Sequence, residues 1–272
     1  MLAWVSGIYD EPELYRIACA YRDIPAEVDA LLGWAARHWA GAAGASGASD
    51  GPVSVLELAA GPADHSIELA RRGLRATALD INPVMCAFAS QSAERAGQAL
   101  SVVEADMRDF KLQDSFDLAI TMLNSACHLF TLDDMVAHLG AVGEHLVSGG
   151  VYIMELTHPA DYFTQASRTS SVWTIEEEGL AAEVRWGGPL DGIDPVTQVT
   201  REHVNVTVRY PDGTTRTVTD VVPNRFWTAT EITAAIKLAG GFTIAATYGD
   251  FDDSTKVDAP EAWRLMLILR RE

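Results

Sequence analysis

The sequence predicts an α/β fold: a doubly wound, mainly parallel sheet of seven strands, with a helical N-terminal lid and an inserted antiparallel β region. Strand-like apolar runs alternate with helical segments between residues 53 and 155, which is typical of parallel strands joined by right-handed crossovers. After Pro159 the pattern changes to two-residue alternation, and the first pattern resumes near Thr228. The 272 residues, 48% of them hydrophobic, are enough for one large core with an appendage.

The first part of the chain reads as a helical prefix followed by a linker. Residues 11–40 carry the apolar spacing of two helices, and Pro25 separates them. Residues 41–52 are rich in Gly, Ala and Ser, which is the composition of a flexible linker. We therefore expect residues 1–52 to form a lid and linker that can move relative to the core.

The most informative segment is the first strand–turn–helix–strand unit. An apolar run at residues 53–58 enters a turn of small residues at 59–63, a helical pattern follows, and a second apolar run ends at Asp80. An acidic residue about 20 positions past such a turn holds a ribose in nucleoside-binding folds. This unit therefore predicts a nucleoside site at the carboxyl edge of the sheet.

The same alternation predicts the elements that follow. Further strands of the main sheet are expected at residues 100–104, 116–121 and 151–155, and helices between them at residues 83–97 and 132–146. In the insertion, Val204, Val206 and Val208 share one face of a strand, and Asp212-Gly213 is the signal of a hairpin. The insertion is therefore expected to be antiparallel.

The end of the chain returns to the first pattern. A helix is expected to begin at Thr228 or Thr230 and to end at Gly240, before strands at residues 242–248 and 263–269. The expected domains are the lid and linker (1–52), a nucleoside-binding domain (53–160 and 225–272) and a substrate-side antiparallel insertion (161–224).

Composition excludes several classes of partner. The formal charge of −18 would repel a phosphate backbone, and the N-terminus lacks a basic region ahead of an apolar run. Cys19, Cys86 and Cys127 match neither a disulfide framework nor a zinc motif, and the seven histidines show no metal-site pairing. We expect a cytoplasmic protein with a small-molecule substrate and with no nucleic acid, membrane or metal partner. The exposed edges of an antiparallel insertion leave a homodimer open.

The turn after the first strand resembles a known motif. Residues 56–63 read LELAAGPA, which is similar to the first motif of the class I S-adenosylmethionine-dependent methyltransferases, an acidic residue followed by Gly-x-Gly-x-Gly. Ala59 and Ala63 stand in the outer glycine positions. Because alanine in the left-handed region costs about 1–2 kcal/mol, we expect negative φ at both, while Gly61 keeps the close approach to the ligand.

Two further segments resemble the same family, especially its glycine and amino-sugar N-methyltransferases. Residues 103–110 read VEADMRDF, and the resemblance implies that Asp106 accepts from the adenine amino group while Met107 packs on the ring. The strand before Leu123 and Asn124 looks like the family's fourth strand, whose following turn lies under the sulfonium.

The resemblance implies a Rossmann-like domain that binds S-adenosyl-L-methionine. Asp80 is expected on the ribose diol, and Glu57 at the tip of the first strand. Arg22, on the prefix, can hold the carboxylate of the cofactor through two parallel charge-assisted bonds. The cofactor-binding candidates are Arg22, Glu57, Ala59, Gly61, Asp80, Ile81, Asp106, Met107, Leu123 and Asn124.

Since the cofactor brings the reactive methyl group, the protein has to align the reactants and exclude water. A base helps wherever the acceptor loses a proton. Glu155, at the carboxyl end of the fifth strand, is the expected base for an amine or an indole carbon, alone or relayed through Tyr21. His128 is the candidate base for a phenolic oxygen.

Aromatic residues are expected to form the substrate wall, because they suit a flat or cationic molecule and keep water from the sulfonium. These substrate-binding candidates are Tyr9, Trp173, Trp186, Phe226 and Trp227.

The expected function is methyl transfer to a nitrogen, or to an electron-rich aromatic carbon such as indole, of a specialised metabolite. An O-methyltransferase acting on a phenol is the first alternative. A nicotinamide-dependent dehydrogenase is weaker, because Asp64 stands at its third glycine position and would repel a pyrophosphate at the helix start. A cofactor-binding regulator without catalysis is the last alternative.

Overall fold

The computed structural model describes residues 7–40, 51–163, 171–177, 179–188 and 190–272. Most of the predicted linker at residues 41–52 lies outside these ranges. The helices are η1 (Ile8–Asp10), α1 (Pro12–Ala18), α2 (Ile24–His38), α3 (Asp64–Arg71), α4 (Pro83–Arg95), η2 (Ser125–His128), α5 (Leu132–His145), α6 (Ala160–Phe163) and α7 (Ala229–Ala239). The strands are β1 (Ser54–Leu58), β2 (Arg75–Asp80), β3 (Leu100–Glu104), β4 (Phe116–Thr121), β5 (Leu146–Thr157), β6 (Ser171–Glu177), β7 (Leu180–Trp186), β8 (Val199–Arg209), β9 (Thr215–Arg225), β10 (Phe242–Tyr248) and β11 (Arg264–Arg271).

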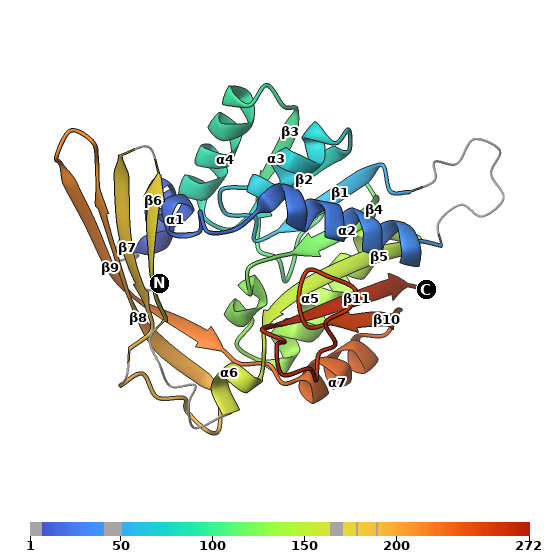
Figure 1. The fold of residues 1–272 in the computed structure, drawn as a ribbon. Coiled ribbons are helices and arrows are strands. Elements are labelled where there is room, and N and C mark those ends of the chain that lie inside the picture. The colour runs from blue at the N-terminus through green and yellow to red at the C-terminus, as the bar shows by residue number, and fades with distance from the viewer. Residues whose placement is uncertain (1–6, 41–50, 164–170, 178, 189) are drawn as a thin grey trace.

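The main sheet has seven strands in the order β10-β11-β5-β4-β1-β2-β3 (Figure 1). β1 to β5 run parallel to one another, and β11 is antiparallel to both of its neighbours, β5 and β10. This order reverses at β1 and β4, and open α/β sheets bind ligands outside the carboxyl ends of the strands at such a point. The predicted doubly wound, Rossmann-like fold is confirmed.

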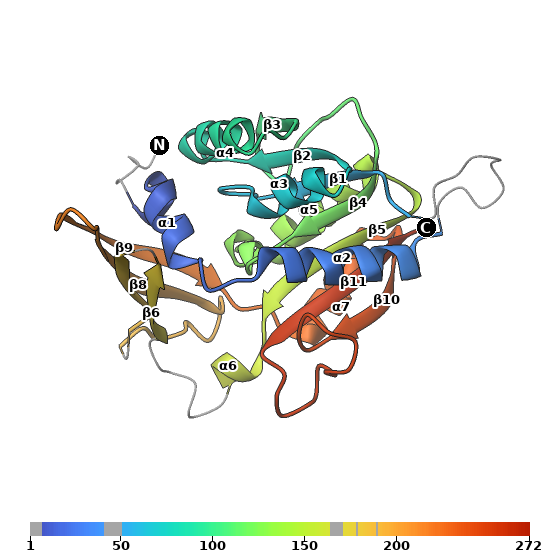
Figure 2. The same ribbon diagram turned by 45° about the horizontal axis from the view of Figure 1, so that its top comes forward.

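Helices cover both faces of this sheet. Successive side chains of a strand point to opposite faces, so Val55 packs in one cluster with Val28 and Leu31 of α2, while Leu56 packs in another with Leu139 of α5. Figure 2 shows α2 lying along the sheet. Only the part of the prefix before α2 lies outside the two apolar clusters of the main sheet, which restricts the expected lid to η1 and α1.

The predicted antiparallel region forms a second sheet, in the order β6-β7-β8-β9. β8 and β9 pair from Val199↔Arg225 to Arg209↔Thr215, so the turn falls at the expected Asp212-Gly213. Valines on alternate positions of β8 face a small apolar cluster that also holds Ile8, Leu14 and Ala18 of η1 and α1. The N-terminal segment thus packs on the second sheet, beside the carboxyl edge of the main sheet (Figure 1).

The helix after the insertion forms as expected. α7 begins after Thr228, whose side chain and Glu231 form a capping box, and it ends at Gly240 with φ 70°. No helix in the described ranges is long and apolar enough to cross a membrane. The domain limits at 1–52, 53–160 with 225–272, and 161–224 stay predictions.

Candidate active site

A cavity of about 960 Å³ lies between the carboxyl edge of the main sheet and the second sheet. Fourteen of the eighteen predicted site residues line it: Tyr9, Tyr21, Ala59, Gly61, Asp80, Ile81, Asp106, Met107, Leu123, Asn124, His128, Trp173, Trp186 and Phe226. Arg22, Glu57, Glu155 and Trp227 are not among its lining residues. The candidates from the prefix, the main sheet and the insertion therefore converge on one site.

The turn after β1 corrects a prediction. Ala59 and Ala63 have φ 50° and 60°, and Gly61 has φ 52°, so all three adopt the left-handed region that glycine favours. The expected negative φ at the two alanines was wrong. Surrounding contacts hold the turn: Ala63 is fully buried against Ala78, and its amide donates to the carbonyl of Ala60 at 2.8 Å. The alanines thus follow the Gly-x-Gly-x-Gly backbone at the cost of strain.

Asp80 closes this turn from the end of β2. Its Oδ2 accepts from the amide of Gly61 at 2.7 Å, and its Oδ1 accepts from the amide of Asn82 at 2.9 Å. Burial raises the pKa of Asp80, and these backbone amides oppose the rise. Each oxygen keeps a further lone pair for a ligand hydroxyl, so the position fits a ribose.

Asn82 ties the lid to the same strand end. Its Nδ2 donates to the carbonyl of Tyr9 at 3.0 Å and to Oδ1 of Asp10 at 3.0 Å. One amide side chain therefore fixes η1 over the predicted ribose site.

The segment after β3 lies on the cavity as predicted, with one partner that sequence analysis missed. Arg108 donates from Nε and Nη2 to the carboxylate of Asp106, at 3.0 and 2.6 Å, and these hydrogen bonds lower the pKa of Asp106. Arg108 also donates to Asp134 at 2.9 Å, and it lines the cavity itself. An adenine amino group at Asp106 would share the carboxylate with this guanidinium.

The turn after β4 is also left-handed, at Leu123 (φ 53°) and Asn124 (φ 59°). The amide of Leu123 donates to Oε2 of Glu155 at 2.8 Å, and Oδ1 of Asn124 accepts from the amide of Thr157 at 3.1 Å. The strand ends of β4 and β5 thus hold this turn in place.

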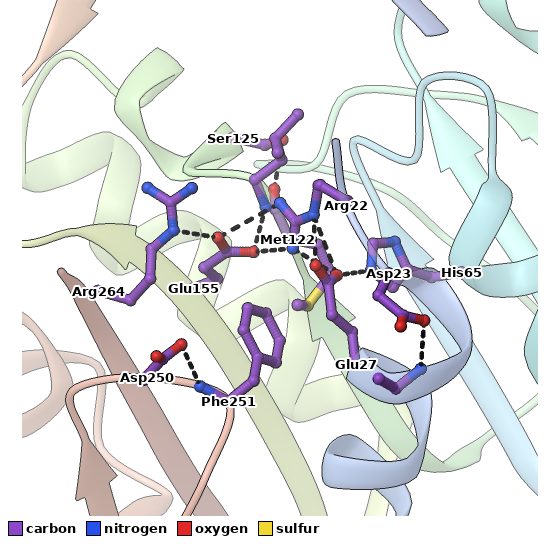
Figure 3. A network of polar contacts seen from close by, with 12 residues as sticks. Arg22, Asp23, Glu27, His65, Met122, Ser125, Glu155, Asp250, Phe251 and Arg264 are labelled. Atoms are coloured by element: carbon purple, nitrogen blue, oxygen red, sulfur yellow. Dashed lines mark hydrogen bonds and ion pairs between the residues drawn. The ribbon is translucent and has the colours of Figure 1, made fainter. Parts of the chain in front are cut away.

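Glu155 does not have the surroundings of a base. It is 0% exposed and lies between the guanidinium groups of Arg22 (2.9 Å) and Arg264 (2.8 Å), as Figure 3 shows. Burial would raise the pKa of Glu155, but the two arginines and the amide of Leu123 outweigh burial and lower it. Glu155 is a structural carboxylate here. Tyr21, the expected relay, lies on the cavity with its ring against Trp173.

Arg22 is likewise occupied. Its Nε and Nη2 donate to both oxygens of Glu27, at 2.8 and 2.6 Å, and its side chain is 4% exposed. It lines a second hollow of about 440 Å³, which shares Ala59 and Leu123 with the large cavity. Since two carboxylates already neutralise its charge, the structure argues against Arg22 as the clamp of a cofactor carboxylate.

The network continues through His65 (Figure 3). Burial lowers its pKa, but the carboxylates of Glu27 (2.8 Å) and Glu57 (3.5 Å) raise the pKa to about 9, so the imidazole is protonated at neutral pH. Glu57 also accepts from the amide and hydroxyl of Ser66, at 2.9 and 2.6 Å. Glu57 therefore lines the smaller hollow as a buried structural group.

Trp227 does not belong to the substrate wall. It is 4% exposed, it packs in the core cluster with α5 and α7, and its Nε1 donates to the carbonyl of Ala126 at 3.2 Å. The neighbouring Phe226 lines the cavity instead. Adjacent residues of an extended segment point in opposite directions, which is why only one of this pair reaches the site.

The remaining wall is aromatic and joins the lid to the insertion. Tyr15, an aromatic residue of the lid that is not among the predicted substrate-binding residues, lies between Tyr9 (ring centroids 5.5 Å apart) and Trp186 (6.5 Å). The hydroxyl of Tyr9 is 3.1 Å from Nε2 of His128. Burial lowers the pKa of His128 to about 4, so its imidazole is neutral.

Sequence analysis also missed Glu202, a cavity-lining carboxylate on β8. The alternation that places Val204, Val206 and Val208 on one face places Glu202 on it too. The signal was therefore present, as a charge that continues an apolar face.

Comparison with known proteins finds similar sequences. Residues 55–150 match a family described as a methyltransferase domain. The glycine/sarcosine N-methyltransferase of Aphanothece halophytica is 24% identical over 213 residues, which are 78% of this chain and 74% of that protein.

Solved structures agree in fold. Streptomyces venezuelae DesVI superposes with a TM-score of 0.76 at 21% identity, over 99% of this chain and 100% of that one. The S-adenosylmethionine-bound CalS10 of Micromonospora echinaspora, described as an amino pentose methyltransferase, gives 0.61 at 23% identity, over 81% and 84%. The chain therefore contains a methyltransferase domain at residues 55–150 and is similar in fold to S-adenosylmethionine-dependent methyltransferases that act on small molecules.

Proposed function

We propose that this enzyme methylates a nitrogen atom of a small amine, a specialised metabolite, in the cytoplasm. The observation that carries the proposal is the single cavity that joins the turn at Gly61 and Asp80 to the aromatic residues Tyr9, Trp173 and Trp186. Its volume of about 960 Å³ is at the upper end for a small-molecule site, which suits a nucleoside cofactor with a second molecule.

The residues at the turn fit S-adenosylmethionine better than a dinucleotide. Asp64 is the first residue of α3, and Asp80 accepts from the amide of Gly61, so carboxylates surround the helix start where a pyrophosphate would bind. The nucleoside of S-adenosylmethionine carries no phosphate. The dehydrogenase alternative has no support from the domain match either.

When bound, the cofactor supplies an electrophilic methyl group, so no covalent enzyme residue is needed. In the proposal, Asp80 holds the ribose, Asp106 and Met107 hold the adenine, and the turn at Leu123 and Asn124 borders the reacting end. The aromatic wall orients the acceptor and excludes water. Neutral His128 with Tyr9 is a polar pair on the acceptor side.

Nitrogen is favoured as the acceptor atom over carbon or oxygen by two findings. The relative from Aphanothece halophytica is named a glycine/sarcosine N-methyltransferase, and CalS10 is described as an amino pentose methyltransferase. The aromatic wall of the cavity also suits a cationic group. A homodimer stays a prediction.

Calorimetric titration with S-adenosylmethionine, S-adenosylhomocysteine and NAD in parallel tests the cofactor. We expect micromolar binding of the two sulfur nucleosides and none of NAD. Mass spectrometry of a panel of amines, indoles and phenols then identifies the methylated class. Methylation of phenols or indoles without any amine would refute the nitrogen assignment.

Asp80→Asn tests the ribose contact. We expect affinity for S-adenosylhomocysteine to fall about 10- to 100-fold, as for a lost charged hydrogen bond, and stability to fall less, by the loss of one of the two bonds from backbone amides. Asp212→Asn, in the hairpin turn far from the cavity lining, is the matched control. Equal losses of stability and affinity in Asp80→Asn would instead indicate that Asp80 only supports the turn.

A further inference from the structure

Glu202 is a charged group on the cavity that has no ion pair within the described residues. It stands on β8 on the same face as Val204, two residues closer to the start of the strand, where the second sheet borders the cavity. Its neighbours on this face are buried valines, so a carboxylate here is costly unless it has a partner. The position therefore points to a role outside the fold.

Two neutral donors hold the carboxylate, and both reach the same oxygen. Trp186 Nε1 donates to Oε2 at 2.9 Å, and Asn224 Nδ2 donates to Oε2 at 2.5 Å. Within the described ranges, Oε1 has no hydrogen bond and the carboxylate has no ion pair. The side chain is thus fixed in position with one oxygen left for a ligand.

Two other carboxylates around the cavity are already compensated by a basic side chain. Asp106 pairs with Arg108, and Asp191 pairs with His203 and accepts from two backbone amides. Burial is the main cause that raises the pKa of Glu202, while Asn224 and Trp186 oppose the rise and the charge of Asp191 adds to it. A half-desolvated carboxylate without a counter-charge favours a cationic ligand.

The surroundings of Glu202 suit an ammonium group. Trp186, whose indole N–H holds Oε2, presents its ring to the cavity beside Tyr15, and Tyr9 follows in the same aromatic row. Aromatic faces around one carboxylate are a recurring way to bind an alkylammonium ion. The row leads back to Gly61, because Tyr15 lies 3.8 Å from the position that a Cβ would take there.

We propose that Glu202 is the residue that recognises the methyl acceptor: its Oε1 binds the protonated amine and takes one of its protons. One N–H bond breaks, one O–H bond forms on Oε1, and the electron pair stays on nitrogen as the lone pair that methyl transfer needs. This assignment rests on the proposed amine specificity. It makes the inserted sheet, and not the strand ends, the source of the base.

The test uses Glu202→Gln, because glutamine can still accept from Trp186 and Asn224 but carries no charge. Glu183→Gln is the matched control, since Glu183 is exposed on β7 of the same sheet and does not line the cavity. Calorimetry measures the binding of glycine, sarcosine and an amino sugar to the enzyme saturated with S-adenosylhomocysteine. Methylation of whichever amine reacts is measured alongside, with melting temperatures for both variants.

We expect Glu202→Gln to bind S-adenosylhomocysteine as the wild type does, to weaken amine binding at least tenfold and to lower kcat/KM on the order of 100-fold. Glu202→Asp should recover part of this loss, while Glu183→Gln changes none of it. Unchanged amine binding and turnover in Glu202→Gln would overturn the role of Glu202 and leave N-methylation standing. A wild type that methylates only phenols or indoles would overturn both.

Discussion

Arg22→Met is the most informative perturbation of the buried network, because its effect separates a structural arginine from a cofactor clamp. The network holds three cations, Arg22, Arg264 and protonated His65, and three anions, Glu27, Glu57 and Glu155. The net charge is therefore zero, and Arg22→Met changes it to −1. The stranded charge is deeply buried, because Glu155 is 0% exposed.

The loss of unfolding free energy in Arg22→Met follows from this burial. Removing one partner of a buried pair costs about 3–5 kcal/mol, and Glu155 keeps Arg264 and the amide of Leu123, so we expect the lower half of this range. The double variant Arg22→Met/Glu27→Gln restores a net charge of zero. It should lose less than the sum of the two single losses, by about 1–3 kcal/mol.

These losses in the free energy of unfolding are measured by urea unfolding of the wild type, both single variants and the double variant. Arg37→Met is the control, since Arg37 and Asp253 form an ion pair whose side chains are about half exposed, at 49% and 50%. Such a surface pair contributes about 0–1 kcal/mol. If Arg22→Met cost no more than this control and instead abolished binding of S-adenosylmethionine, the structural interpretation of Arg22 would be wrong.

Three further predictions concern strain, titration and packing. Ala59→Gly should relieve the left-handed strain, which costs about 1–2 kcal/mol, while the greater entropy of glycine in the unfolded chain takes back about 0.5–1 kcal/mol. The melting temperature should therefore rise by a few degrees, and a lower melting temperature would contradict this prediction. His65, with a folded pKa of about 9 against about 6.5 when unfolded, should stabilise the fold fully below pH 6.5, with the contribution lost as the pH rises through 9. His65→Gln should remove that slope in urea unfolding measured from pH 6 to 10. Trp227→Phe should lower stability by about 1–2 kcal/mol through the lost bond to Ala126 and leave the KM for the acceptor unchanged, whereas Trp186→Phe should raise that KM.

Local sequence patterns were sufficient for most of the architecture. The position of Asp80 after the second strand depends only on the order of elements, and the cap at Thr228 depends on residues three positions apart. Both features are encoded by neighbours in the chain. The same holds for the hairpin at Asp212-Gly213.

The errors have a common physical origin, which is contact between distant parts of the chain. The backbone at Ala59 follows from tertiary packing around the turn and not from the preference of alanine. Glu155 is neutralised by Arg264, more than a hundred residues away, and by Arg22 on the prefix. Trp227 is buried because α5 and α7 close over it, which its aromatic character alone does not reveal.

The N-terminal segment joins the two sheets that enclose the cavity. Ile8 and Leu14 are fastened to the inserted sheet, whereas α2 is fastened to the main sheet. An opening of the cavity that keeps both apolar contacts intact must therefore pivot within residues 19–23 and carry η1, α1 and the insertion away as one body. That movement breaks the two bonds from Asn82 to Tyr9 and Asp10, the contact between Tyr9 and His128 and the ion pair between Arg16 and Asp64, so these polar contacts hold the cavity closed.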